Sequence, residues 1–360
     1  MPYGVSVSDE SRTLSQIKNN FIRKIKKIIA RYGFDDEEWA QAISSQYFLL
    51  CIAKQLKCGK KDYANLLNKC LSCFSVTYTG DYILDSEKLL ITPNETNKIV
   101  QCMQEEDNID DYYTHSAKMQ AKNINGEQMY LNFHFGLLIR IVSSEDTEVL
   151  RAIKHKCLDN LMADCALDTS DGWYPYRVPW ITARILISLK KIDYSTYPAK
   201  DQVDEVIKTS ITSLYQRIDD KAAFWRSGVG KWASKWEATG LCLEALFVWD
   251  AIDNHKTEIR RILDYACSEE NRDSWLGIPI DFTTEDGANN TLSATILASV
   301  IFRITKKSFS DIHMDLCDGI LKFFDNVINV INKNAVNTVR QYCTIPQILH
   351  YVLAAFENID

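Results

Sequence analysis

Residues 171–189 read Asp171-Gly-Trp-Tyr-Pro-Tyr-Arg-Val-Pro-Trp180-Ile-Thr-Ala-Arg-Ile-Leu-Ile-Ser-Leu189. A polar turn with two prolines leads into a run of small and apolar residues that is long enough for a helix. The run returns twice, as Trp236-Glu-Ala-Thr and as Leu292-Ser-Ala-Thr, and each start lies 56 residues after the previous one. A fixed period of this size indicates an internally repeated architecture.

Each repeat reads as a loop, a helix, a short turn and a second helix. The first helix of each pair is nearly all apolar, which is typical of a helix that is buried on all sides, and the second is amphipathic, as an outer wall should be. The expected first helices are 180–190, 235–252, 292–303 and 345–357, and the expected second helices are 201–217, 256–267 and 310–332. Inner and outer rings of helices predict an all-α protein with an α/α toroid fold.

The N-terminal part of the chain repeats less regularly. Helical periodicity covers 14–32, 37–56 and 61–73, and a β-rich stretch from Val76 to Leu84 surrounds Gly80-Asp81, which suits a small hairpin. We therefore expect a single toroid domain over residues 1–360. Its irregular N-terminal helices with the hairpin at 76–84 would occupy 1–125, and its regular repeats 126–360.

The composition narrows the class of protein. The chain has 360 residues, 46% of them apolar, and a formal charge of −7, which argues against a general nucleic-acid binder. Eleven cysteines without a secretory signal do not indicate a disulfide framework, and no apolar run is long enough for a membrane span. These features favour a soluble, cytoplasmic protein.

One segment is basic, although the net charge of the whole chain is negative. Six Lys and Arg residues lie between Lys18 and Arg31 with no acid among them. We interpret them as the solvated face of an outer helix. Contact with an acidic membrane surface or with nucleic acid is the alternative.

The repeat resembles that of the terpenoid cyclase and protein prenyltransferase α/α toroids. The resemblance rests on Asp171-Gly-Trp173 before the helix at Trp180, on Trp236-Glu-Ala-Thr-Gly-Leu, and on Asp273-Ser-Trp275 with Ser293-Ala-Thr295. It covers residues 168–357. The resemblance implies the fold more than the activity, because function depends on sites that differ among proteins of one fold.

The catalytic motifs of that superfamily are broken in this chain. Its Asp-x-Asp-Asp acid has only Asp107-Asn-Ile-Asp-Asp111 as a counterpart, with different spacing, and Asp35-Asp-Glu-Glu38 lacks the last carboxylate of a magnesium motif. Its zinc motif is matched in spacing by Asp315-Leu-Cys317 with His350 downstream, but that pair falls on an expected outer helix. We therefore expect no catalytic residues and no cofactor, with zinc as the one metal that these residues would suit.

The loops that precede the inner helices gather aromatic and charged residues at one rim of the expected toroid. The candidate ligand or partner rim comprises Trp173, Tyr176, Arg177, Trp225, Arg226, Trp232, Trp275 and Asp281. By contrast, Trp180 and Trp236 are expected to face the core at the starts of inner helices. The rim residues could instead pack between helical hairpins.

This pattern favours a non-catalytic binding or accessory protein. Its cavity or Trp-rich rim would hold an apolar small molecule, a peptide or a partner protein. The alternative is an enzyme, either of the terpenoid or prenyl-transfer type or a glycosidase on an (α/α)6 barrel that uses rim carboxylates.

Overall fold

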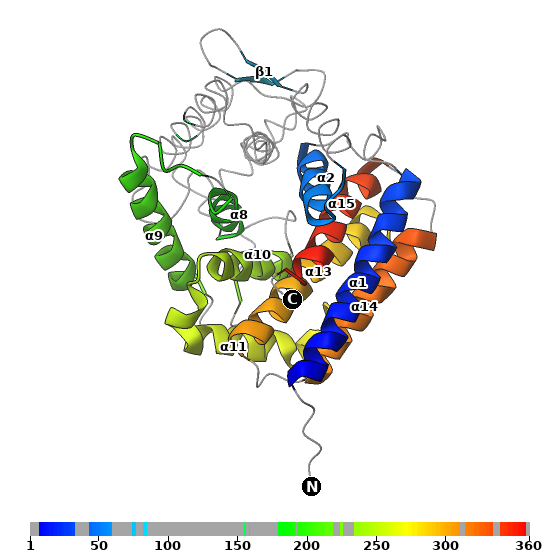
Figure 1. The fold of residues 1–360 in the computed structure, drawn as a ribbon. Coiled ribbons are helices and arrows are strands. Elements are labelled where there is room, and N and C mark those ends of the chain that lie inside the picture. The colour runs from blue at the N-terminus through cyan, green and yellow to red at the C-terminus, as the bar shows by residue number, and fades with distance from the viewer. Residues whose placement is uncertain are drawn as a thin grey trace.

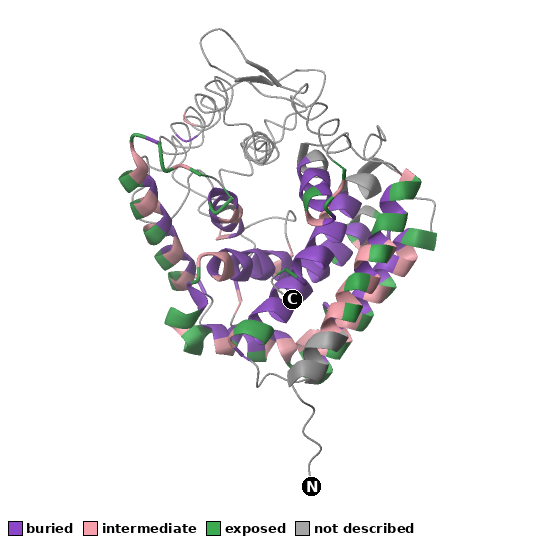
Figure 2. Ribbon diagram, in the orientation of Figure 1, coloured by how far each residue is buried: buried purple, intermediate pink, exposed green. Residues whose placement is uncertain are grey.

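The structure is a computed structural model of the whole chain, and it describes residues 7–32, 43–59, 74–76, 82–84, 155, 158, 179–191, 193–218, 224–225, 234–309, 314–333 and 339–357. The fold is all-α apart from one short pair of strands. Its helices form an inner layer, buried on most sides, and an outer layer with one exposed face (Figures 1 and 2).

Among the helices that the structure describes, five make up the inner layer, and we call them the inner helices. They are α8 (Pro179–Leu189), α10 (Lys235–Val248), α13 (Glu285–Lys307), α15 (Val339–Ala354) and α2 (Ile43–Gln55). Each of them packs on the next in this order, so α2 from the N-terminal region packs on α15 near the C-terminus. Three side-chain bonds join Arg184 to Glu237, Glu237 to Ser293, and Glu244 to Arg303. The bonded residues lie 53, 56 and 59 positions apart, so the contacts advance along neighbouring helices together and the helices run parallel.

The 56-residue register of the sequence coincides with the inner helices. Trp180, Trp236, Leu292 and Ile348 are all buried, one on each of α8, α10, α13 and α15. This confirms the prediction that Trp180 and Trp236 face the core.

In the described part of the chain, four long helices form the outer layer. They are α1 (Val7–Tyr32), α9 (Lys200–Gln216), α11 (Lys256–Cys267) and α14 (Met314–Lys333). Helix α9 packs on α8, α14 on α13, and α1 on both α14 and α15. Each buries an apolar face, as with Ile259, Ile262, Leu263 and Ala266 of α11, and exposes a polar one.

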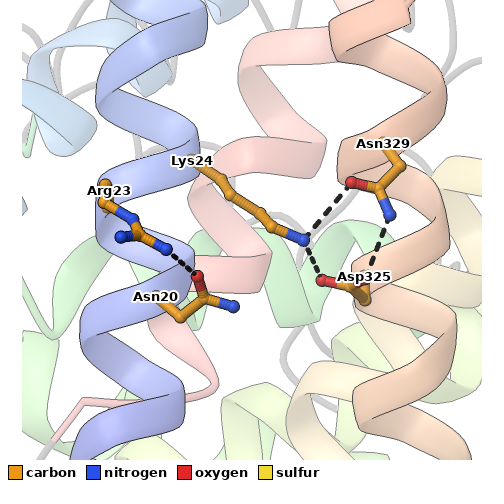
Figure 3. A network of polar contacts seen from close by, with 5 residues as sticks. All are labelled: Asn20, Arg23, Lys24, Asp325 and Asn329. Atoms are coloured by element: carbon orange, nitrogen blue, oxygen red, sulfur yellow. Dashed lines mark hydrogen bonds and ion pairs between the residues drawn. The ribbon is translucent and has the colours of Figure 1, made fainter.

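A polar network fastens α1 to α14. The ammonium group of Lys24 forms an ion pair with Asp325 and donates to Asn329 Oδ1 at 3.3 Å, while Asn329 donates to Asp325 at 3.0 Å (Figure 3). Below this network, the rings of Phe21 and Phe324 meet edge to face in the core. Because Phe21 lies beside Phe324 and Lys24 beside Asp325, the two helices also run parallel.

Local sequence explains how α10 and α13 begin. Ser234 caps α10, its hydroxyl accepting from the backbone N–H of Glu237 at 3.1 Å, and Thr284 caps α13 in the same way through Gly287 at 3.1 Å. Helix α13 therefore starts at Glu285 and not at 292 as predicted, because the Thr cap and the acidic first turn precede the apolar run. A short helix, α12 (Glu269–Asp273), lies between α11 and α13 and was not predicted.

The other helix bounds differ from the predictions mainly at the ends. Helix α1 already begins at Val7, before the predicted start at residue 14. Helix α10 ends at Val248 and is followed by the 3-10 helix η2 (Ile252–His255). The expected helix at 61–73 lies outside the described residues.

Two short strands are present in the N-terminal region. Strands β1 (Phe74–Val76) and β2 (Tyr82–Leu84) pair in antiparallel fashion, with Ser75 opposite Ile83. The residues between the strands, 77–81, lie outside the described part of the chain.

Candidate functional site: a polar cluster on the inner helices

Two of the expected rim tryptophans lie in the core. Trp225 and Trp275 are fully buried, and each indole N–H donates to a carbonyl near the end of the preceding outer helix. Trp225 Nε1 lies 2.7 Å from Leu214 O of α9, and Trp275 Nε1 lies 2.8 Å from Ala266 O of α11. The prediction that they form a binding rim is therefore wrong, because both rings satisfy helix-end carbonyls and pack inside.

The carboxylate of Asp281 is hydrogen-bonded within the turn that leads into α13. It accepts bonds from the backbone N–H of Thr283 at 2.7 Å and from the hydroxyl of Thr284 at 2.9 Å. Hydrogen bonds from Thr283 and Thr284 lower the pKa of this carboxyl. The remaining rim residues lie outside the described part of the chain; they are Trp173, Tyr176, Arg177, Arg226 and Trp232.

The described residues offer a different candidate, a set of polar side chains on the inner helices that we call the inner polar cluster. It comprises Arg184 of α8, Glu237 and Glu244 of α10, Ser293 and Arg303 of α13, and Tyr351 of α15. Glu237 and Glu244 are seven residues apart, two helical turns, so they share one face of α10. The cluster thus draws on four consecutive inner helices.

Glu237 links three helices. Arg184 Nη2 donates to its Oε1 at 3.0 Å, and the Ser293 hydroxyl lies 3.4 Å from its Oε2. Burial raises the pKa of the Glu237 carboxyl, although the charge of Arg184 and the hydrogen bonds from Arg184 and Ser293 act in the opposite direction. Desolvation outweighs the nearby cation, so this carboxyl releases its proton less readily than an exposed glutamate.

Glu244 is held by a second arginine. Arg303 Nη1 donates to its two oxygens at 2.7 and 2.5 Å, and the guanidinium carbon lies 4.5 Å from the centre of the Phe247 ring. Burial alone would lower the pKa of Arg303, but the charge and hydrogen bonds of Glu244 raise it overall. The two glutamates of α10 are therefore each matched to one cation of a neighbouring inner helix.

Tyr351 adds a buried hydroxyl to these charges. Burial is the main cause that raises its pKa to about 12; Arg184 and Lys191 lower the pKa, and Glu244 and Glu237 raise it. The backbone carbonyl of Tyr351 accepts from the Ser299 hydroxyl at 2.7 Å, which ties α15 to α13.

A neighbouring polar group joins α2 to α15 and to the residues that follow α8. Lys191 donates to the hydroxyl of Tyr47 at 2.8 Å, and Tyr47 shares a hydrogen bond with Cys51. His350 contacts Gln55 Oε1 at 3.3 Å through Nδ1. Burial, followed by the charges of Lys191 and Arg303, lowers the pKa of His350 well below its usual value, so the ring is neutral at physiological pH.

The described residues contain no group of three or more His, Cys, Asp and Glu side chains that could hold a metal ion. Of the residues in the predicted zinc pattern, Asp315 and Cys317 lie on the outer helix α14, whereas His350 is buried on α15 between the rings of Phe48 and Tyr351.

The sequence contained a signal for the inner polar cluster that the prediction did not use. Arg184, Glu237 and Arg303 each interrupt a stretch that is otherwise small or apolar. A charge in a helix that is buried all round requires a partner nearby, because an unpaired charge is costly to desolvate. Opposite charges 53 and 59 residues apart, close to the repeat length, were the recognisable pattern.

Neither a protein-family model, nor a curated protein, nor a solved structure matches this chain. Among the helices that the structure describes, none is both long and apolar enough to cross a membrane.

Proposed function

We propose that this protein is an α/α toroid that acts as a non-catalytic binding or accessory protein for an apolar ligand, a peptide or a partner subunit. The toroid is supported by the succession of parallel inner helices, by the outer helices that back them, and by the packing of α2 on α15. The rim of Trp173, Tyr176, Arg177, Arg226 and Trp232 remains the proposed contact surface.

The pairing of both glutamates of α10 with arginines carries this proposal. A glycosidase needs two carboxyl groups facing one substrate bond, one as acid and the other as base or nucleophile. Here Glu237 accepts from Arg184 and Glu244 from Arg303, so both groups serve contacts between helices. Such pairs fix the register of neighbouring helices, as a scaffold requires.

An enzyme is the second candidate, and one observation favours it. A buried carboxyl with a raised pKa, such as Glu237, is the usual source of a proton in general acid catalysis. In that case the Ser293 hydroxyl and the Arg184 guanidinium would position the acid.

The two candidates differ in what happens to a bound ligand. The purified full-length chain and the Glu237→Gln variant would be incubated with isoprenoid alcohols and diphosphates of graded length and with oligosaccharides. Thermal unfolding would report binding, and mass spectrometry would report conversion. We expect a ligand class that raises the Tm of both proteins and is recovered unchanged.

Conversion by the wild-type chain that is lost in Glu237→Gln would overturn the binding proposal and support the enzyme. Stoichiometric zinc in the purified protein would also contradict it. A Trp232→Ala variant tests the rim. If Trp232 contacts the ligand at the rim, the ligand should raise the Tm of this variant less than that of the wild type, while the two proteins without ligand have the same Tm.

A further inference from the structure

The outer surface formed by α1 and α14 differs in charge from the other outer helices. On α9 and α11 exposed cations are paired with nearby acids, as in Lys208 with Glu205 at 3.8 Å and Arg260 with Asp264 at 2.9 Å. Lys256, at the start of α11, is likewise paired with Asp253 at 3.2 Å. Such pairs leave little net charge at those places.

On α1 and α14 the exposed cations lack such acids. We call them the basic face, and they are Arg23, Lys26, Lys27 and Arg31 of α1 with Lys322 and Lys333 of α14. Within the described part of the chain, none of the six forms an ion pair. Asp325, three residues after Lys322, is paired with Lys24, which points from α1 toward α14, while Arg23 donates to Asn20 of α1 itself (Figure 3).

The two helices present these charges together. They run parallel, and Arg31 Nη1 donates to the backbone carbonyl of Asn332 at 2.9 Å, which brings Arg31 beside Lys333. From Arg23 to Arg31 the stripe on α1 extends about 12 Å along the helix axis. The exposed acids of α14, Asp315 and Asp318, lie near its start, at the opposite end from Arg31 and Lys333, and Asp318 is one turn before Lys322.

The face carries no apolar group that could insert into a partner. Besides the cations, the exposed residues of α1 and α14 whose side chains are described are Gln16, Asn19, Ala30, Asp315, Asp318, Asn326 and Asn332. The apolar sides of both helices are packed in the core, with Ile25, Ile28, Phe324 and Ile328 fully buried. Charge is therefore what the described part of this face offers a partner, which would meet it through phosphate or carboxylate groups.

We infer that the basic face docks the protein on an anionic lipid bilayer, as a peripheral and purely electrostatic contact. Two helices lying side by side offer a broad face, which allows both to reach a planar surface of headgroups. Duplex DNA presents its phosphates on a narrow, curved surface, so fewer of these cations would reach it than reach a planar bilayer, and it is one of the outcomes of the test. Each Lys or Arg near such a membrane strengthens binding about fivefold, or about 1 kcal/mol.

Co-sedimentation with vesicles tests this inference. The full-length chain would be mixed with phosphatidylcholine vesicles, with or without about 30% phosphatidylserine, at low and at high salt. The test variant is Lys26→Gln/Lys27→Gln/Lys322→Gln. The control is Lys208→Gln/Lys256→Gln/Arg260→Gln, which removes the same charge from cations that are paired on other helices.

We expect the wild-type chain and the control to bind phosphatidylserine vesicles at low salt and to be released at high salt. The test variant should bind about 100-fold more weakly, since three charges are lost. Five of the six substituted positions are exposed and Arg260 is partly exposed, and circular dichroism verifies folding. The inference is overturned by no binding to phosphatidylserine vesicles, by equal losses in both variants, or by duplex DNA displacing the vesicles at equal phosphate concentration.

Discussion

Arg303 of α13 and Glu244 of α10 form a buried ion pair, with Nη1 at 2.7 and 2.5 Å from the two carboxylate oxygens. Their side chains are only 7% and 10% exposed. One turn further along α13, Lys307 forms a second pair at 2.7 Å with Asp250, which follows the end of α10, and these side chains are 50% and 71% exposed. A buried and an exposed ion pair therefore join α13 to α10 and to the turn after it.

These two pairs should differ sharply in their effect on stability. Arg303→Met leaves Glu244 as an uncompensated buried charge, and we expect a loss of about 3–5 kcal/mol in the free energy of unfolding. Lys307→Met breaks an exposed pair and should cost less than about 1 kcal/mol. Urea unfolding of both variants at neutral pH measures the difference, and equal losses would show that Glu244 does not depend on Arg303.

The closeness of α10 and α13 depends on a glycine. A Cβ atom on Gly240 would lie 2.9 Å from Ile296 Cγ2 and 3.0 Å from the backbone nitrogen of Leu297. Gly240→Ala should therefore push the two inner helices apart and destabilise the protein by about 1–3 kcal/mol, despite the better helix propensity of alanine.

Gly319 provides the matched control on the outer helix α14. Its added Cβ would meet only the end of the Leu276 side chain, at 3.2 Å. Because that side chain can shift, Gly319→Ala should be neutral or stabilise by up to about 1 kcal/mol. A Gly240→Ala protein that is as stable as Gly319→Ala would contradict close packing between α10 and α13.

The inner helices were predictable because their pattern is set by burial. A helix enclosed on all sides must be apolar all round, and the 56-residue register of Trp180, Trp236 and Leu292 marks equivalent buried positions. The helix ends were less predictable, since side-chain caps decide them. Thr284 starts α13 well before its apolar run, and no periodicity shows this.

The rim was predicted wrongly for Trp225 and Trp275 because a tryptophan after a polar break fits two environments. Its indole ring can lie on the surface, or it can fold back and satisfy an open carbonyl at the end of the preceding helix. The choice depends on where that helix end lies in space, which the local sequence does not encode. The inner polar cluster was missed for a related reason. Its four charged residues can be buried only as pairs, and which charges pair depends on how the helices meet in space.

Trp225 should therefore contribute to stability. Trp225→Ala removes a fully buried indole and its bond to Leu214 O, and we expect a loss of about 3–5 kcal/mol. Trp225→Phe keeps a ring in the core but leaves that carbonyl without the indole donor, so it should lose less. Thermal unfolding ranks the variants. A Trp225→Ala protein with the wild-type Tm would show that the Trp225 ring is not packed in the core.

Glu237 should make the stability of the protein depend on pH. Burial raises its pKa in the folded state above the ordinary value of 4.5. Between pH 4.5 and the raised pKa, the unfolded chain has released this proton and the folded protein still holds it. The free energy of unfolding therefore falls as pH rises through this window and levels off above it.

Glu237→Gln removes this dependence, because glutamine cannot ionise. The free energy of unfolding of both proteins would be measured in urea from pH 4.5 to 7.5. We expect the wild-type value minus the Glu237→Gln value to decrease as the pH rises. Asp281→Asn is the control. Its carboxyl has a lowered pKa, below the ordinary 3.8, so its difference from the wild type should stay constant over the same range. A difference for Glu237→Gln that is flat or rises with pH would mean that Arg184 outweighs burial, and that Glu237 is an ordinary ionised partner of that arginine.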